Sequence, residues 1–394
     1  MKKLFFITGE SSGDMHGASL LNELYKMIPP RDLTVKAVGG SALENTGADI
    51  FFNCKYLANV GLTEVLKNLS LYYNLERELL FELKVFNPDV LILVDFPGFN
   101  LRIAKKARKY LPNTKIVYYF PPQVWAWASW RTKTLQDCCD LVLCGFPFEE
   151  EFHRKRGVNA FYIGNPLVNE IENFDKTKIR EELGLTKYDK IISIFPGSRK
   201  SEIHYMLPVF LKGIEILSKS SPDYKFFISQ AKNIENIENE KCFQELSKSL
   251  KEKIKILPVK TNENRRLLCM SDLLWLTSGT VTLEAALYET PMILGYRGNE
   301  LNYFLYKLLK KTDLIGLPNI ILNEKLVPEL IQNDATPENF VHHTKEILRV
   351  PGKLEAIKRN LQKVKEKLGT KNASHEAALK IRELIPEYKV FMNK

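Results

Sequence analysis

The fold is decided by a short stretch near the N-terminus, "KLFFITGESSGDMHG", residues 3–17. Apolar, β-favouring residues occupy positions 4–7, and glycines, serines and carboxylates separate them from a helix-like segment over 16–27. Gly9 and Gly13 permit a tight turn at this junction. The stretch therefore predicts one strand–turn–helix unit of an α/β protein, with polar side chains at the carboxyl end of the strand.

Similar apolar runs recur along the chain and alternate with helix-like segments such as 99–110. This alternation is typical of a parallel sheet covered by helices on both faces. Because the pattern starts again after residue 185, we predict an α/β protein with two Rossmann-like, doubly wound domains that face a cleft. Ligands of such sheets bind outside the carboxyl ends of the strands, so the residues that follow each strand are the candidates for a site.

A polar segment over residues 164–178 follows a strand-like run and predicts the boundary between the domains. We expect an N-terminal Rossmann-like domain over 1–168 and a C-terminal one over 169–365. Residues 336–388 carry helical signals without strand signals. A C-terminal helix within 366–394 is therefore expected to pack back on the N-terminal domain.

Composition restricts the class of protein. Of the 394 residues, 45% are hydrophobic and 26% are charged, which is typical of a globular chain. The first apolar run is too short for a signal peptide, and no run reaches the roughly 18 apolar residues of a membrane span, so a cytoplasmic location is expected. The six cysteines lack metal-ligand spacing, so no metal is expected. The net charge of +10 favours an anionic partner, which could be a nucleotide, a nucleic acid or an acidic lipid surface.

Two carboxylates follow strands of the first half. Glu10 comes directly after the first strand and has no evident capping role, so we expect it to face the cleft. Asp95 ends the apolar run "LILVD", where nearby apolar walls would raise its pKa towards the range of a general base. The alternative is that Asp95 caps a helix that begins near Phe99. Asp14 is expected to cap the helix that begins near Met15.

The segment "FPPQVWAWASWR", residues 120–131, follows the next predicted strand and holds three tryptophans beside Gln123. Tryptophan combines a large apolar ring with one polar N–H group. The segment therefore predicts a wall of the cleft or an amphipathic surface, and core packing is the alternative.

Two turns of the second half have the composition of phosphate sites. "FPGSRKSEI" places Gly197, Ser198 and Arg199 between a strand and a helix, where backbone N–H groups and a guanidinium can hold a diphosphate. A plain strand–turn–helix junction is the alternative for this turn.

The second turn lies in "LLWLTSGTVTLEAALYETPMILGYR", residues 273–297. Ser278, Gly279 and Thr280 open a predicted helix whose first N–H groups favour phosphate. Glu284 follows one turn later, where a carboxylate can accept both hydroxyls of a ribose. The alternative is a capping box with Thr280 at the N-cap.

In this order, the motifs resemble those of the lipid-A-disaccharide synthase family, inverting glycosyltransferases of the GT-B fold. The resemblance runs from residue 4 to about residue 330 and rests on "GESSGD", "VDFPGFN", "PPQVWAWASWR", "YIGNPL", "FPGSRKSEI", "SGTVTLEAAL", "MILGYR" and "LPNIIL". It implies that UDP-2,3-diacylglucosamine donates its sugar to 2,3-diacylglucosamine 1-phosphate, giving lipid A disaccharide 1-phosphate and UDP in lipopolysaccharide biosynthesis. It also implies a reaction without a cofactor, an acceptor-binding, membrane-facing N-terminal domain and a UDP-sugar-binding C-terminal domain.

The resemblance also assigns roles to single positions. Asp95 and Glu10 match family acids linked to catalysis, and Asp95 is the preferred base. Arg199 matches the arginine of the family's PGSR motif and is assigned to catalysis, Asn319 matches a family asparagine important for activity, and Glu284 matches the ribose-binding acid. The implied substrate-binding residues are Gly9, Ser12, Gln123, Gly197, Ser198, Ser278, Gly279, Thr280, Glu284 and Arg297.

The chain departs from the family pattern at two positions. Gly98 stands where many relatives carry a second acid, which removes one rival base. Asn165 stands where many relatives carry histidine, which weakens any role built on that imidazole. Neither departure affects the nucleotide motifs.

Acylated substrates would bring the enzyme to the cytoplasmic face of the inner membrane. Residues 60–73, "VGLTEVLKNLSLYY", place apolar side chains at helical spacing, and residues 301–311, "LNYFLYKLLKK", mix aromatic and basic side chains. Each segment predicts either a membrane contact or a core face. The expected membrane-contacting residues are Leu62, Val65, Leu66, Leu69 and Tyr72.

A UDP-sugar 2-epimerase is the alternative function, because it shares two such domains and a ribose-binding acid. An epimerase needs neither an acceptor nor the apolar face of residues 60–73. A nucleic-acid binder fits the net charge, but the lysines are dispersed and no binding motif is present, so no nucleic-acid partner is expected. The sequence leaves open whether the chain forms a homodimer.

Overall fold

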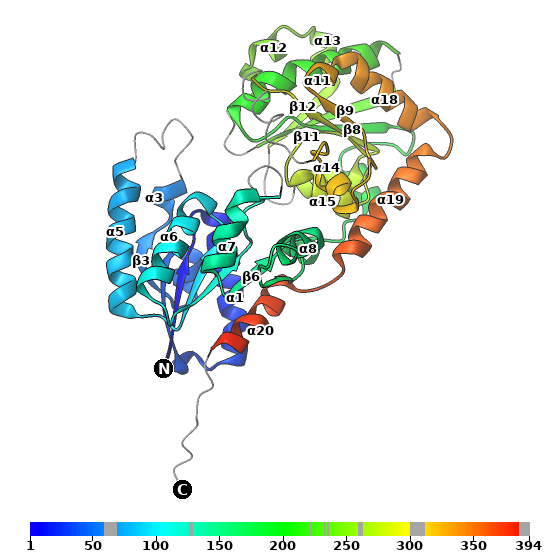
Figure 1. Cartoon of the computed structure of the whole chain (residues 1–394). Helices are drawn as coiled ribbons and strands as arrows, with labels where there is room; N and C mark the ends of the chain where they lie inside the picture. Colours follow the sequence, from blue (N-terminus) through cyan, green and yellow to red (C-terminus); the bar gives the residue numbers. More distant parts are fainter. Residues whose placement is uncertain are drawn as a thin grey trace. The chain divides into compact units, whose positions relative to one another are not determined.

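The computed structural model describes residues 1–58, 69–125, 129–220, 223–231, 234, 236–258, 263–299 and 312–385. The chain divides into two compact units (Figure 1). The first comprises residues 1–169 together with the segment from Thr370 onward, and the second comprises residues 170–369. The divisions predicted from the sequence, after residues 168 and 365, lie close to these.

The described part of the first domain holds a seven-stranded parallel sheet in the order β3-β2-β1-β4-β5-β6-β7. Because β1 lies between β2 and β4, the direction of strand addition reverses between β1 and β4, which is the switch point where such sheets bind ligands. The strands are β1 (Lys2–Ile7), β2 (Leu33–Gly39), β3 (Asp49–Asn53), β4 (Val90–Val94), β5 (Lys115–Tyr119), β6 (Leu141–Cys144) and β7 (Ala160–Tyr162). The helices are α1 (Ser11–Met27), α2 (Ser41–Asn45), α3 (Lys55–Ala58), α5 (Leu69–Phe86), α6 (Pro97–Tyr110), α7 (Thr132–Cys138), α8 (Pro147–Arg154), α9 (Pro166–Glu170) and α20 (Ala373–Leu384), with 3-10 turns at Pro30–Asp32 and Ser129–Arg131.

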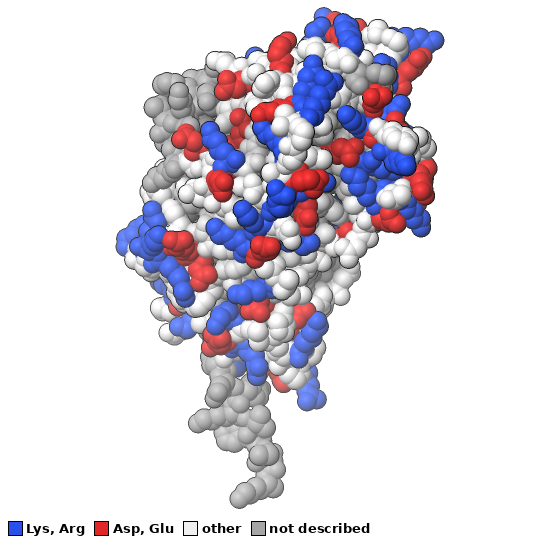
Figure 2. All heavy atoms as spheres, turned by 90° about the vertical axis from the view of Figure 1, so that its right-hand side faces the viewer, with Lys and Arg blue, Asp and Glu red and all other residues white. Residues whose placement is uncertain are grey.

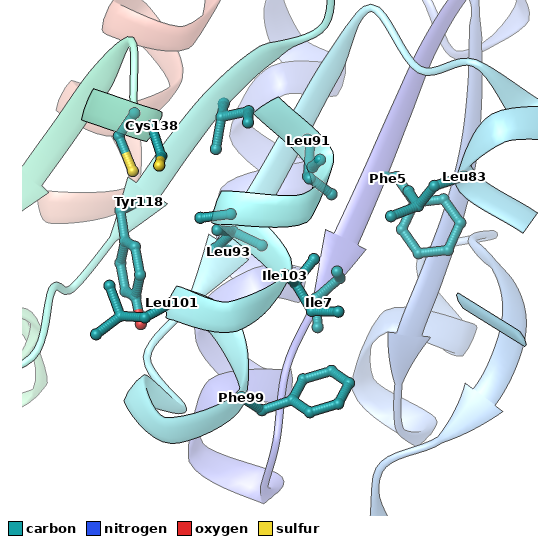
Figure 3. Close-up of a cluster of buried hydrophobic side chains, with 14 of the residues drawn as sticks. Phe5, Ile7, Leu83, Leu91, Leu93, Phe99, Leu101, Ile103, Tyr118 and Cys138 are labelled. Carbon is teal, nitrogen blue, oxygen red and sulfur yellow. The ribbon is translucent and has the colours of Figure 1, made fainter. Parts of the chain in front are cut away.

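Both faces of this sheet are buried, which explains the continuous apolar runs in its sequence. Successive side chains of a strand point to opposite faces, so Phe5 and Ile7 of β1 join one core while Leu4 and Phe6 join the other. Figure 3 shows the first core, in which side chains of β1, β4 and β5 meet those of α5 and α6.

The C-terminal helix α20 belongs to the first domain and packs against α1. Ala377, Ala378 and Ile381 are fully buried in the second core. Gly164 lies close to the segment that leads into α20, with φ at +97°, and a Cβ there would come within 2.5 Å of the Lys371 carbonyl oxygen. Glycine is therefore required where α20 meets the domain.

The described part of the second domain holds a six-stranded parallel sheet in the order β10-β9-β8-β11-β12-β13. Its switch point lies between β8 and β11. The strands are β8 (Lys190–Phe195), β9 (Tyr224–Gln230), β10 (Ile254–Pro258), β11 (Leu273–Thr277), β12 (Met292–Tyr296) and β13 (Glu329–Ile331). The helices are α10 (Lys176–Glu182), α11 (Lys200–Ser220), α12 (Lys241–Gln244), α13 (Lys248–Lys251), α14 (Glu263–Met270), α15 (Val281–Leu287), α17 (Leu317–Leu322), α18 (Pro337–Arg349) and α19 (Lys353–Leu368), with 3-10 turns at Ile237–Asn239 and Gln332–Asp334. The prediction of two doubly wound α/β domains is confirmed.

Two surface properties bear on the partner classes. None of the described helices combines the length and apolar character needed to cross a membrane. On the face shown in Figure 2, basic side chains are interspersed with acidic ones. The net charge of +10 therefore does not gather into a single basic stripe on this face.

The packing of α20 generates the first prediction. Ile381→Ala removes a fully buried side chain, and we expect urea denaturation to show a loss of about 2–4 kcal/mol in the free energy of unfolding. Leu379→Ala, on the same helix with the side chain 38% exposed, is the matched control and should cost much less. Equal losses for the two variants would contradict the packing of α20 on the first domain.

Candidate active site

The two predicted acids of the first domain follow the adjacent strands β1 and β4. Asp95 is partly buried, whereas Glu10 is exposed. Burial raises the pKa of the Asp95 carboxyl to about 6, and the nearby Glu10 carboxylate adds to this rise. A carboxylate with such a pKa is ionised at neutral pH but still has useful basicity, so Asp95 is suited to accept a proton.

The backbone that carries Asp95 adopts an unusual conformation. Asp95 has φ of +47° and Phe96 has φ of +49°, both in the left-handed region that non-glycine residues seldom occupy. Such residues cost on the order of 1–3 kcal/mol each and cluster at functional sites. The Phe96 ring lies so close to Gly9 that a Cβ on Gly9 would approach it to 2.2 Å. The turns after β1 and β4 are thus packed on each other, and Gly9 has a steric role there.

The capping alternatives for these acids do not hold. The prediction that Asp14 caps its own helix is wrong, because α1 already begins at Ser11. The Asp14 carboxylate instead accepts hydrogen bonds from the N–H groups of Gly40, Ala42 and Leu43, at the start of α2. Asp95 lies one residue before Phe96, the N-cap residue of α6, and its carboxylate interacts with the backbone N–H of Phe96 and not with an N–H group of the first helical turn.

The Ser12 hydroxyl is the polar neighbour of Glu10 and donates to its Oε1 at 2.8 Å. This hydrogen bond orients the Glu10 carboxylate from within the first turn of α1. The predicted residues Glu10 and Ser12 are therefore in direct contact.

The tryptophan-rich segment is anchored at one residue. The indole N–H of Trp125 donates to Glu149 Oε1 at 3.1 Å, and its ring meets Phe148 edge-on at 4.9 Å. Burial raises the pKa of the Glu149 carboxyl to about 7. Gln123, two residues before Trp125, is exposed, so the segment presents a polar side chain to solvent beside a partly buried aromatic anchor.

The second domain has a pocket of about 430 Å³ at the carboxyl ends of β8, β9 and β11. It brings together most of the residues predicted for this domain and adds Ser229 and Asn264, which the sequence analysis missed. The Ser229 hydroxyl donates to Asn264 Oδ1 at 2.6 Å. The lining includes Gly197, Ser198, Arg199, Glu202, Ser229, Asn264, Ser278, Gly279, Thr280 and Glu284.

The turn after β8 depends on a glycine and a carboxylate. Gly197 has φ of +118°, and a Cβ there would lie 2.4 Å from Glu202 Oε2. The same oxygen accepts the N–H groups of Ser198 at 2.8 Å and Arg199 at 3.3 Å. Arg199 also forms an ion pair with Glu202, but its side chain is 80% exposed and lines the pocket. The turn thus presents a guanidinium on a backbone held in place by Glu202.

The turn after β11 is held from the neighbouring loop. The Ser278 hydroxyl donates to the Ile315 carbonyl at 2.8 Å. Gly279 and Thr280 are exposed at the pocket, and the Thr280 side chain makes no capping hydrogen bond within the described structure. The capping-box alternative therefore fails for Thr280.

Glu284 lies at the pocket wall beside an arginine that sequence reasoning missed. Its Oε1 is 3.5 Å from Nε of Arg265, and Nη2 of the same arginine donates to the Glu170 carboxylate at 2.9 Å. Burial raises the pKa of Glu284, and the Arg265 guanidinium opposes that rise. Arg265 thus fixes the orientation of the predicted ribose-binding carboxylate.

Comparison with known proteins identifies the family. A family model described as lipid-A-disaccharide synthetase matches residues 4–383. The chain is 34% identical over 364 residues to the lipid-A-disaccharide synthase of Nitrosococcus oceani, covering 92% of this chain and 91% of that protein. The chain belongs to the lipid-A-disaccharide synthase family. The corresponding enzyme of Myxococcus xanthus is 32% identical over 390 residues, covering 98% of this chain and 99% of that protein.

Solved structures with the same fold include enzymes of other families. The UDP-GlcNAc 2-epimerase of Neisseria meningitidis, solved with UDP-GlcNAc, has a TM-score of 0.60 at 14% identity, covering 97% of this chain and 99% of that chain. The glycotransferase of kitacinnamycin has a TM-score of 0.62 at 12% identity, with 98% and 99% coverage. At this identity the likeness establishes the GT-B fold alone.

Asn319, the family asparagine, has a structural position. It is fully buried, and its Nδ2 donates to the Val327 carbonyl and to Glu329 Oε1 at 3.0 and 2.9 Å. Its Oδ1 accepts the N–H groups of Leu326 and Val327. Glu329 in turn accepts the N–H of Ile315, whose carbonyl holds Ser278. Both ends of the Asn319 amide are hydrogen-bonded to neighbouring groups of its own domain. Asn319 therefore supports the turn after β11 through Glu329 and Ile315, and it is not among the residues that line the pocket.

The two departures from the family pattern are accommodated. A Cβ added to Gly98 would meet no described atom within 4 Å, so the position of the second family acid is open in this chain. The Asn165 amide donates to the Gly145 carbonyl at 3.1 Å, and its oxygen accepts the N–H of Leu167. Asn165 therefore ties the end of β6 to α9.

The remaining predicted residues are placed as follows. Arg297 is exposed directly after β12. Tyr72 is partly buried, and its ring packs against Phe96 and Phe99. Its hydroxyl donates to the Leu57 carbonyl. This side chain therefore faces the core, and its packing does not support the predicted membrane contact. Leu69 begins α5. Leu62, Val65 and Leu66 lie outside the described residues, and so does the segment 301–311.

The raised pKa of Asp95 generates a stability prediction. A carboxyl whose folded pKa lies above its unfolded pKa destabilises the fold above the folded pKa, and this cost disappears below the unfolded pKa. Asp95→Asn should therefore raise the free energy of unfolding by about 2–3 kcal/mol at pH 8 and by little at pH 4, measured by urea denaturation. Asp137→Asn, at an exposed position of α7, should change stability little at either pH. A gain for Asp95→Asn that is equal at both pH values would contradict the buried, raised carboxyl.

Proposed function

We propose that the chain catalyses the transfer of the sugar of UDP-2,3-diacylglucosamine to 2,3-diacylglucosamine 1-phosphate. The family match over residues 4–383 supports the reaction. The observation that carries the mechanism is the partly buried Asp95 at the switch point of the first sheet, with a pKa of about 6. The first domain would supply the base, and the second would hold the donor.

The donor half-site is the pocket of the second domain. Arg199 and the turn at 278–280 suit the two phosphates of UDP, because a guanidinium and backbone N–H groups offset their charge. Glu284, fixed by Arg265, suits the ribose hydroxyls, since an ionised carboxylate can accept both. The pocket residues thus match the diphosphate and the ribose of a nucleoside diphosphate.

The transfer itself requires one proton acceptor and one stabilised leaving group. Asp95 would take the proton from the 6-hydroxyl of the acceptor as that oxygen attacks the anomeric carbon of the donor sugar. The bond from this carbon to the UDP oxygen breaks with inversion, and the electron pair leaves on UDP. Arg199 would offset the charge that develops there. No step in this scheme needs a metal ion.

The decisive experiment measures UDP release with and without the acceptor. A transferase releases UDP from the donor only when 2,3-diacylglucosamine 1-phosphate is present, whereas a 2-epimerase acts on a UDP-sugar alone. Asp95→Asn should lower kcat by about 10²-fold or more, and Glu10→Gln should have a smaller effect. UDP release that does not depend on the acceptor would overturn the proposal. Near-normal turnover of Asp95→Asn with loss in Glu10→Gln would exchange the two roles.

The donor half-site generates a binding prediction. Gly197→Ala would force a Cβ against Glu202 in a left-handed backbone, so the turn that carries Ser198 and Arg199 must shift. Isothermal titration calorimetry should show UDP binding weakened by about tenfold or more. Gly352→Ala, also left-handed but at the start of α19, controls for backbone strain alone and should bind UDP normally. Unchanged binding by Gly197→Ala would contradict the assigned site.

The acylated substrates imply a peripheral location on the cytoplasmic face of the inner membrane, and the surface of α5 and α6 supports it. A groove of about 330 Å³ lies between these helices, and three aromatic side chains at its edge are 45–70% exposed: Tyr73, Phe81 and Tyr110. Arg77, Lys84 and Lys106 line the same groove, in which Lys106 pairs with the Glu76 carboxylate and Lys84 Nζ lies 4.0 Å from the Tyr110 ring centre. Exposed aromatics beside cations suit the headgroup region of an anionic bilayer.

Vesicle binding tests this surface separately from catalysis. The triple variant Tyr73→Ser, Phe81→Ser and Tyr110→Ser should sediment about tenfold less with vesicles that contain phosphatidylglycerol. Tyr188→Ser, at a 77% exposed tyrosine of the second domain, is the control and should bind normally. Wild-type binding that is equal on phosphatidylcholine vesicles and insensitive to salt would contradict the role of the cations.

A further inference from the structure

We propose that Asn100 and Tyr118 are positioning residues that hold Asp95 by its backbone carbonyl. The Asp95 carbonyl oxygen accepts hydrogen bonds from Asn100 Nδ2 and from the Tyr118 hydroxyl, each at 2.8 Å. Both side chains are fully buried beneath the turn. The inference rests on the proposed role of Asp95 as the base and adds the two groups that fix its position.

Asn100 connects the two strand ends at the switch point. Its Nδ2 also lies 3.2 Å from the Val94 carbonyl at the end of β4 and 3.4 Å from the Ile7 carbonyl at the end of β1. Three carbonyls facing one amide nitrogen require it to be the donor. Its Oδ1 is buried and has no hydrogen-bond partner among the described residues. The Asn100 side chain thus joins the ends of β1 and β4, the strands that precede Glu10 and Asp95.

Tyr118 reaches the same carbonyl from the neighbouring strand β5. Its ring belongs to the core between the sheet and α6 (Figure 3). Burial, together with the negative charge of Asp95, raises the pKa of the phenol well above its ordinary value. The hydroxyl therefore stays protonated and remains a donor at every pH at which the enzyme would act.

The turn needs such support because its conformation is unfavourable. Asp95 and Phe96 are both left-handed without being glycine, and the Asp95 N–H is already used by the Tyr119 carbonyl. Loss of a donor to the Asp95 carbonyl would let this peptide rotate towards an ordinary conformation. The carboxylate would then leave its partly buried position, and its pKa would fall towards the usual value of an aspartate.

The test compares Tyr118→Phe and Asn100→Leu with the wild-type chain at full length. Selective ¹³C-aspartate labelling follows the Asp95 carboxyl by NMR titration, with the resonance assigned by its absence in Asp95→Asn. We expect its pKa to fall by about one unit or more in each variant. We expect kcat to fall by about tenfold or more while KM stays within about twofold, because the base is misplaced and substrate contacts are kept.

Tyr119→Phe is the matched control. Tyr119 is adjacent and equally buried, but its side chain belongs to the core on the other face of the sheet. It should leave the Asp95 pKa and kcat at wild-type values. A wild-type pKa in Tyr118→Phe, or an equal fall in Tyr119→Phe, would overturn the proposal. If Asn100→Leu does not fold, Tyr118→Phe decides alone. Full turnover of Asp95→Asn would overturn the assigned base but not the positioning of its side chain, which the titration decides separately.

Discussion

The turn that carries Asp95 in the first domain and the pocket of the second domain both depend on the order of strands in the two parallel sheets. We call them the two half-sites. In the first sheet β1 lies between β2 and β4, and in the second sheet β8 lies between β9 and β11. Crossovers in such sheets are right-handed, so the connections on either side of this point leave to opposite faces. The turns at the strand ends remain uncovered, and the polar side chains that follow these strands converge there. The chemistry of the chain follows from this constraint.

The two half-sites differ in how their polar groups are held. The turn after β4 keeps a carboxylate partly buried, which raises the pKa of Asp95 and destabilises the fold at neutral pH. The turns after β8 and β11 carry the polar groups of the pocket, and neighbouring carboxylates hold these turns by hydrogen bonds to backbone N–H groups. Glu202 fixes the backbone of Arg199, and Glu329 fixes the loop that holds Ser278. Partly buried acids thus hold these two turns in place, whereas the proposed base itself destabilises the fold.

Sequence reasoning succeeded where function is local in the chain. Asp95, Glu10 and the turn at 197–199 each follow an apolar run directly, so strand-end logic predicted their positions at the switch points. It failed where a side chain acts across a long separation. Asp14 caps α2 instead of its own helix, because the N–H groups it binds belong to a segment 26 to 29 residues later.

The supporting residues were missed for the same reason. Arg265 reaches Glu170 across 95 residues and Tyr118 reaches Asp95 across 23, and no local pattern marks either partner. For Asn319 the motif indicated that the residue matters, but it did not show whether its role is catalytic or structural. Its burial and full set of hydrogen bonds place it behind the site, which required the fold to be known.

In the proposed reaction Asp95, held partly buried at the switch point, takes the proton of the acceptor hydroxyl. The pH dependence of kcat/KM tests it most directly, because its acid limb reports the pKa of the essential base in the free enzyme. We expect kcat/KM to rise with pH through a pKa of about 6, and we expect Glu10→Gln to move this limb to lower pH because the Glu10 charge contributes to the raised pKa of Asp95. An acid limb near the ordinary pKa of an aspartate, unchanged in Glu10→Gln, would contradict it.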